Sequence, residues 1–221
     1  MALNKLKFNS INVTPAANEA LKFNSSANGF ETGSAGGAIT FIKKLTASSS
    51  STLSFVDGSS DVVLDNTYKE YLFIFNNIHP ATNNQQFTFQ GSTDSGSSYG
   101  VTITSSFFQA YHAEDDSATS LAYNGNNDLA QSTSFQIIAD TTGNGNDESA
   151  SGFLHLFNPS STTFLKHFIS VDNHYYSGTY SINDYAAGYF NTTSAITALQ
   201  FKAASGNIDS GTIKLYGIKD S

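Results

Sequence analysis

The sequence predicts an all-β protein: a jelly-roll-like antiparallel β-sandwich with an extended N-terminal β-repeat arm. Ser, Thr and Asn make up 75 of the 221 residues, and these residue types favour pleated surfaces and turns over helices. Short segments that alternate apolar and polar residues recur along the chain, most of them separated by Gly, Asn, Asp or Ser. Such segments are typical of strands in sandwiches and barrels. No segment has a helical period, so we expect almost no helix.

The first 37 residues are predicted to form the arm, because they contain a 15-residue repeat. The pentapeptide Leu-Lys-Phe-Asn-Ser occurs at residues 6–10 and again at 21–25, and each copy is followed by a breaker, Pro15 or Gly29. This pattern predicts a strand and a turn in each copy. Residues 31–37 contain three glycines and predict a flexible joint.

The apolar residues of the two copies form stripes that a two-stranded segment cannot bury by itself. We therefore expect them to pack on the chain's own domain, on another protein or on other copies of the chain, most simply in a homotrimer. The residues assigned to this role are Leu6, Phe8, Leu21 and Phe23.

Residues 38–221 are predicted to form the β-sandwich. The expected strands lie at residues 39–45, 52–56, 62–64, 68–79, 86–90, 99–104, 107–112, 134–139, 153–157, 163–171, 196–202 and 212–216. Residues 71–75 are apolar at every position, which predicts a central strand covered on both faces.

Composition excludes several classes of protein. The net charge is -8, all ten basic residues are Lys, and no basic run occurs, so we expect no nucleic-acid partner. The absence of Cys excludes disulfides and Cys-bound zinc. The longest apolar run, residues 71–75, is far too short to cross a bilayer, and no apolar segment follows the N-terminal lysines. We therefore expect no membrane insertion and no secretory signal.

No catalytic motif is present. The chain lacks the Gly-x-Ser-x-Gly elbow, the His-Glu-x-x-His helix and the phosphate-binding Gly-rich loop. We expect no enzyme activity and no cofactor. A glycan-processing enzyme stays open as a less favoured alternative, which would require two close carboxylates in a groove.

An oxygen-rich segment extends from Asp140 to Glu148. It is compatible with calcium, which takes six to eight oxygen ligands, but it lacks the spacing of an EF-hand. A solvated loop explains the same composition, so no metal site is predicted and the calcium question stays open.

The segment 172–185 places four tyrosines among Asn, Asp and Gly without a regular apolar period. This mixture is typical of adaptable binding loops, because tyrosine offers contact area and a polar tip. The same rings would also suit a subunit interface or the covered end of a sandwich. The candidate receptor or glycan contacts are Asp172, Asn173, His174, Tyr175, Tyr176, Tyr180, Asp184 and Tyr185.

Three features resemble structural proteins of tailed bacteriophages, especially fibre-like and adhesin-like proteins of marine phages. They are the loop at residues 89–99, with Ser95 where that pattern has a Gly, the closing strand at residues 210–219, and the 15-residue repeat. The resemblance implies a virion protein, assembled in the host cytoplasm and released by lysis. Two roles stay open: a tail-fibre or receptor-binding component held by its arm, or a capsid decoration or head-fibre protein without a receptor role.

Overall fold

The computed structural model describes residue 13, residues 20–33 and residues 37–220. The chain divides into two compact units, Met1–Ala38 and Ile39–Ser221. The residues that the structure describes contain strands and turns and no helix, which confirms the all-β prediction. Consequently, none of them belongs to a helix long and apolar enough to span a membrane.

In the first unit, β1 (Ala20–Phe23) pairs antiparallel with β2 (Phe30–Gly33). The second copy of the repeat therefore forms a strand and a turn, as predicted. The flexible joint predicted for residues 31–37 is wrong at residues 31–33, because they pair with β1. Leu6 and Phe8, from the first copy, lie outside the described residues.

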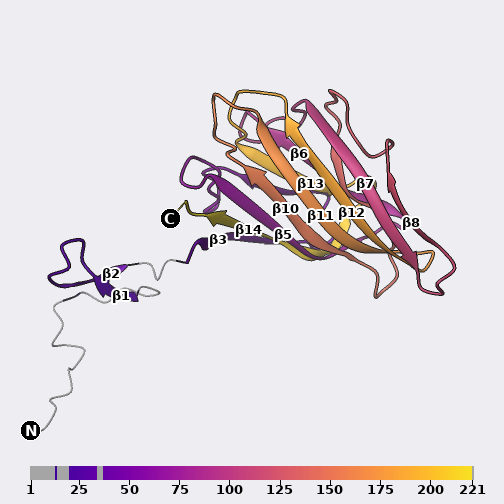
Figure 1. Ribbon diagram of the computed structural model, residues 1–221, viewed down its shortest axis with the longest axis horizontal. Coiled ribbons are helices and arrows are strands. Elements are labelled where there is room, and N and C mark those ends of the chain that lie inside the picture. The colour runs from indigo at the N-terminus through magenta and orange to yellow at the C-terminus, as the bar shows by residue number, and fades with distance from the viewer. Residues whose placement is uncertain (1–12, 14–19, 34–36, 221) are drawn as a thin grey trace, which may run out of the picture. The chain divides into compact units, whose positions relative to one another are not determined.

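The second unit is an antiparallel β-sandwich of two sheets (Figure 1). The larger sheet has eight strands in the order β3 (Ile39–Thr46), β14 (Ile208–Ile218), β5 (Glu70–Pro80), β10 (Ala150–Phe157), β11 (Lys166–Tyr176), β12 (Tyr180–Phe190), β7 (Ile103–Ala113) and β8 (Thr119–Tyr123). The smaller sheet has four, in the order β4 (Leu53–Val56), β13 (Ala198–Ala203), β6 (Gln85–Ser92) and β9 (Gln136–Thr142).

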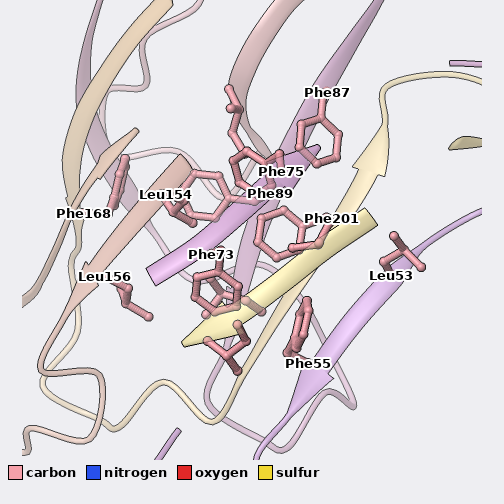
Figure 2. Packing of buried hydrophobic residues seen from close by; sticks show 14 of the residues in the cluster. Leu53, Phe55, Phe73, Phe75, Phe87, Phe89, Leu154, Leu156, Phe168 and Phe201 are labelled. Carbon is pink, nitrogen blue, oxygen red and sulfur yellow. The ribbon is translucent and has the colours of Figure 1, made fainter. Parts of the chain in front are cut away.

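An aromatic cluster fills the space between the sheets (Figure 2). Phe201 of β13 lies at its centre, with ring centroids 5.4 Å from Phe73 and 5.5 Å from Phe75, both on β5. Phe87 and Phe89 of β6 stack on the same ring. Burying a large apolar side chain contributes roughly 1.5–3 kcal/mol, so this cluster is a main source of the stability of the sandwich.

The structure differs from the predictions for these strands in five places. Residues 62–64 form no strand, because the Leu64 amide donates to Asp57 Oδ1 at 2.8 Å instead of joining a sheet. The two strands predicted at 99–104 and 107–112 are one strand, β7, which begins at Ile103. β8 and β12 were not predicted. On β5, Leu72 and Ile74 are half-buried, so that strand is central but is not covered on both faces by residues of this unit.

Candidate functional site

The segment 172–185 is not a loop but the end of the β11–β12 hairpin. The two strands pair continuously, with Asp172 opposite Asp184 and Tyr176 opposite Tyr180, and residues 177–179 form the turn. Side chains on a strand alternate between its two faces. The hairpin therefore divides the predicted contact residues between the interior of the sandwich and the opposite, outer face of the eight-stranded sheet.

Three of the predicted contacts, Asp172, His174 and Asp184, are buried inside the sandwich. Their prediction as surface contacts is wrong, because Asp172 and His174 follow Phe168 and Ser170 on the inward face of β11. Asp184 lies opposite Asp172 and is buried on the inward face of β12. His174 Nδ1 lies 3.0 Å from Asp172 Oδ2 and 3.8 Å from Asp184 Oδ2. Gln109 Nε2 and the Asp140 amide each donate to Asp184 at 2.8 Å.

The electrostatics of this buried cluster follow from its dry surroundings. Burial, together with the charge of Asp140, raises the pKa of Asp172 well above its usual value. Burial and the neighbouring Asp172 raise the pKa of Asp184 to about 7. Burial also lowers the pKa of His174, although Asp184 and Asp140 act in the opposite direction. Ionising both carboxylates in this space is therefore unfavourable without a cation.

The outward residues of the hairpin contribute to the outer face of the sheet. The Tyr185 ring stacks on Phe108 of β7 with centroids 4.6 Å apart. Asn173 is exposed and its Nδ2 donates to Ser181 Oγ at 3.0 Å. Tyr175 is half-buried and, by strand alternation, lies on the same side. These residues are thus separated from the inward ones by the sheet itself.

Tyr176 and Tyr180, next to the turn, line an open pocket of about 350 Å³. Tyr111 of β7 completes an aromatic trio: its ring centroid lies 5.5 Å from that of Tyr180, which lies 5.8 Å from that of Tyr176. The remaining lining residues are Gln109, Thr141 and Ile182. The pocket combines aromatic faces with a few polar groups, which is the composition of small-molecule sites.

Sequence reasoning missed Gln109, Tyr111 and Thr141 as members of this pocket. Gln109 and Tyr111 share the inward face of β7 with Phe107. A Gln and a Tyr at alternate positions after Phe107 were a detectable sign that this end of the strand does not simply extend the apolar core. Their meeting with the hairpin depends on β7–β12 pairing, in which Tyr111 lies opposite Ile182. That long-range register is not visible in the sequence.

Thr141 has a positive φ of 47° at the pocket. A β-branched residue rarely adopts this conformation. Thr141 lies where the pairing of β9 with β6 is irregular, between the Thr142–Gln85 and Ala139–Phe87 pairs. Strained backbone of this kind tends to occur at ligand sites. The pocket therefore contains a backbone conformation, at Thr141, that a threonine does not favour by itself.

The acidic segment 140–148, which begins within β9, uses its oxygens internally. Glu148 Oε2 accepts from the Gly145 amide at 2.6 Å, and the Glu148 carbonyl lies 2.7 Å from His79 Nδ1. Asp140 Oδ1 accepts from Gln86 Nε2 at 3.1 Å. In the part of the chain that the structure describes, the one group of three suitable metal ligands is Asp172, His174 and Asp184. The geometry thus gives no support to a calcium site in this segment.

Two of the features behind the phage resemblance have defined structures. In the turn after β6, Ser95 and Gly96 have φ angles of 57° and 82°, so Ser95 adopts the left-handed conformation that the resembling pattern gives to Gly. The closing strand β14 lies between β3 and β5 and is not an edge strand.

Comparisons with protein-family models, with curated proteins and with solved structures gave no match to this chain. The function is therefore argued from the site.

Proposed function

We propose that this protein is a structural component of a tailed-bacteriophage virion, specifically a tail-fibre or receptor-binding protein. The N-terminal arm attaches it to other virion proteins and joins three copies. The sandwich binds a host surface glycan through the pocket of Tyr111, Tyr176 and Tyr180. The protein is assembled in the host cytoplasm and reaches new hosts in particles released by lysis.

The tyrosine-lined pocket is the observation that carries this proposal. Tyrosine rings offer apolar faces to the C–H groups of a sugar and keep a hydroxyl for hydrogen bonding. Gln109 and Thr141 line the same space and can both donate and accept hydrogen bonds. None of the described residues that line the pocket is charged, and the chain carries a net charge of -8, which favours a neutral sugar over an anionic one.

A capsid decoration or head-fibre role is the second candidate, and a separate surface favours it. The outer face of the eight-stranded sheet exposes large apolar side chains, among them Leu121 (72%), Tyr123 (61%) and Ile169 (45%). Apolar patches of this kind mark protein contacts. A sheet face held against a capsid lattice would cover these residues and need no receptor.

The structure offers little to a glycan-processing role. The close carboxylates, Asp172 and Asp184, are buried, and neither lines the pocket. A glycosidase needs its two carboxyl groups on either side of the scissile bond.

The test is a titration of the full-length protein with neutral sugars (glucose, galactose and N-acetylglucosamine, and their short oligomers), followed by ligand-observed NMR. We expect weak binding, which becomes useful through several copies on one particle. Tyr176→Ala and Tyr180→Ala should each weaken it at least about fivefold, since hot-spot truncations cost over ~1 kcal/mol.

Tyr123→Ala is the matched control, because Tyr123 is exposed on the outer face of the sheet and outside the pocket. It should bind like the unaltered protein. Equal binding by the folded pocket variants, or no binding of any sugar in the panel, would remove the glycan role and favour decoration.

A further inference from the structure

We propose that Asp172, His174 and Asp184 form a buried binding site for one Zn²⁺ ion, which ties β11 to β12. This inference is independent of the glycan proposal, because none of the three residues lines the tyrosine pocket. It assigns a role to side chains that the pocket does not use.

Strand geometry brings the three ligands together. Asp172 and His174 are two positions apart on β11, so both point inward. Asp184 lies directly opposite Asp172 in the β11–β12 register. One donor atom from each residue lies within 4.8 Å of the other two. His174 Nδ1 is the ring atom that faces both carboxylates, at 3.0 and 3.8 Å.

An unsatisfied carboxylate oxygen is a second observation that favours a bound cation. None of the described residues hydrogen-bonds to Asp172 Oδ1, and the Asp172 side chain is only 1% exposed, so water cannot readily replace a partner. A buried polar atom without a partner destabilises the folded state, and does so more strongly when it carries charge. A cation held by both oxygens of Asp172 would remove this destabilisation.

The charges of the cluster require compensation. The ion pairs that the described residues form with Asp172 and Asp184 come from His174 alone. Asp184 accepts two hydrogen bonds, from Gln109 and from the Asp140 amide, and both favour its ionised form. When both carboxylates are ionised beside a neutral imidazole, they carry two negative charges, which one divalent ion neutralises.

The donor set favours zinc over the common hard cations. Ca²⁺ and Mg²⁺ take oxygen ligands, and Ca²⁺ needs six to eight of them. Zn²⁺ accepts imidazole nitrogen and carboxylate oxygen and is usually four-coordinate. One nitrogen, one Asp184 oxygen and both Asp172 oxygens supply four donors without water, which suits a buried structural site.

The test starts from full-length protein stripped with EDTA and titrated with ZnCl₂ by calorimetry. We expect one equivalent to bind and the unfolding temperature to rise, whereas MgCl₂ and CaCl₂ leave it unchanged. His174→Gln and Asp172→Asn should weaken Zn²⁺ binding by more than about 100-fold, because loss of a second-shell partner alone can cost that much.

The control is His112→Ala, which removes an exposed histidine whose Nε2 lies 3.2 Å from Asp116 Oδ1. This variant should bind zinc as the unaltered protein does. The proposal is overturned if the unaltered protein binds no zinc, or if folded His174→Gln binds it unchanged.

A second measurement covers variants that fail to fold. Crystals of the unaltered protein soaked in ZnCl₂ should give an anomalous peak at the zinc edge between the three side chains. A peak only at surface histidines, or no peak, would also refute the site.

Discussion

Asp94 closes the turn after β6 with three hydrogen bonds to its carboxylate. Ser92 Oγ donates to Oδ1 at 2.6 Å, the Ser98 amide donates to Oδ1 at 3.0 Å, and Ser98 Oγ donates to Oδ2 at 2.6 Å. These bonds, with Ser92 first, lower the pKa of Asp94 to about 2. In this chain, which has few charged residues, serine hydroxyls stabilise the ionised carboxylate, as a nearby Lys or Arg does in other proteins.

The stabilisation by Asp94 should depend on pH in a definite direction. The pKa is lower in the folded protein than its usual value of 3.8, so the ionised carboxylate stabilises the fold above about pH 4 and loses this effect as the pH falls through about 2. Asp94→Ala should therefore unfold at lower urea concentration than the unaltered protein at pH 7. Near pH 2 the two midpoints should converge.

An NMR titration of the Asp94 side chain checks the cause directly. Its midpoint should lie near 2 and should move upward in Ser98→Ala, which removes one donor. A midpoint near 4 in the unaltered protein would show that the three hydrogen bonds do not hold in solution.

At the scale of elements, the β11–β12 turn contains a strained residue. Thr179 has a φ of 67°, and its amide donates to the Tyr176 carbonyl at 2.9 Å. A left-handed conformation costs a β-branched residue more than it costs Gly, which adopts it freely. The turn holds Tyr176 and Tyr180 at the pocket, so its conformation bears on binding.

Thr179→Gly should stabilise the protein by roughly 0.5–1 kcal/mol, because it removes the penalty of a positive φ. Thr119→Gly is the matched control: Thr119 is exposed in β8 and is not among the positive-φ residues. Glycine there should destabilise by roughly 0.5–1 kcal/mol, since it weakens a strand. Urea unfolding measures both changes, and the same sign for both would contradict the strain argument.

The elements that the sequence predicted well are those with apolar inward faces. The predicted ranges of β3, β5 and β6 lie close to the observed ones. Apolar and polar residues alternate in the middle of β6, and residues 71–75 of β5 are all apolar. β12 was missed because its inward residues include Asp184 and Gly188, which break the apolar alternation. The buried cluster of Asp172, His174 and Asp184 was missed for the same reason. Its polar residues give this buried hairpin a composition that is typical of an exposed loop.

At the scale of the pocket, the sequence pointed to Tyr176 and Tyr180 and not to Tyr111. The two predicted residues flank one turn and are neighbours in the chain. Tyr111 joins them only through the pairing of β7 with β12. Local composition can reveal a local cluster, whereas residues brought together by sheet order require the structure.

At the scale of the whole molecule, apolar residues lie exposed on each compact unit. In the first unit, Phe23 (65%) stacks on Phe30 with ring centroids 4.9 Å apart. In the second, Phe108, Phe153 and Ile169 are exposed on the outer face of the larger sheet. In the proposed virion role, other copies and other virion proteins would cover these surfaces. Either the first unit or the outer face of the larger sheet can join copies of this chain, and the oligomeric state of truncated protein distinguishes the two.

We predict that residues 1–37 join the chains into a homotrimer. Burying a Leu or Phe side chain contributes roughly 1.5–3 kcal/mol, and partner chains are the simplest cover for Leu21 and Phe23. Light scattering should therefore give three times the chain mass of 23.6 kDa for the full-length protein. A chain beginning at Ile39, which keeps the entire core of the sandwich, should be a folded monomer.

Other outcomes of the same measurement are equally informative. Two monomers would show that the trimer is wrong and that the arm docks to a different protein. Two oligomers of the same size would assign the contact to the outer face of the eight-stranded sheet. In that case Ile169→Lys, on the exposed side of β11, should dissociate them, because a lysine there would place a charge in an apolar contact. Phe23→Ser should then leave the mass unchanged, whereas it should reduce the mass if the arm makes the trimer.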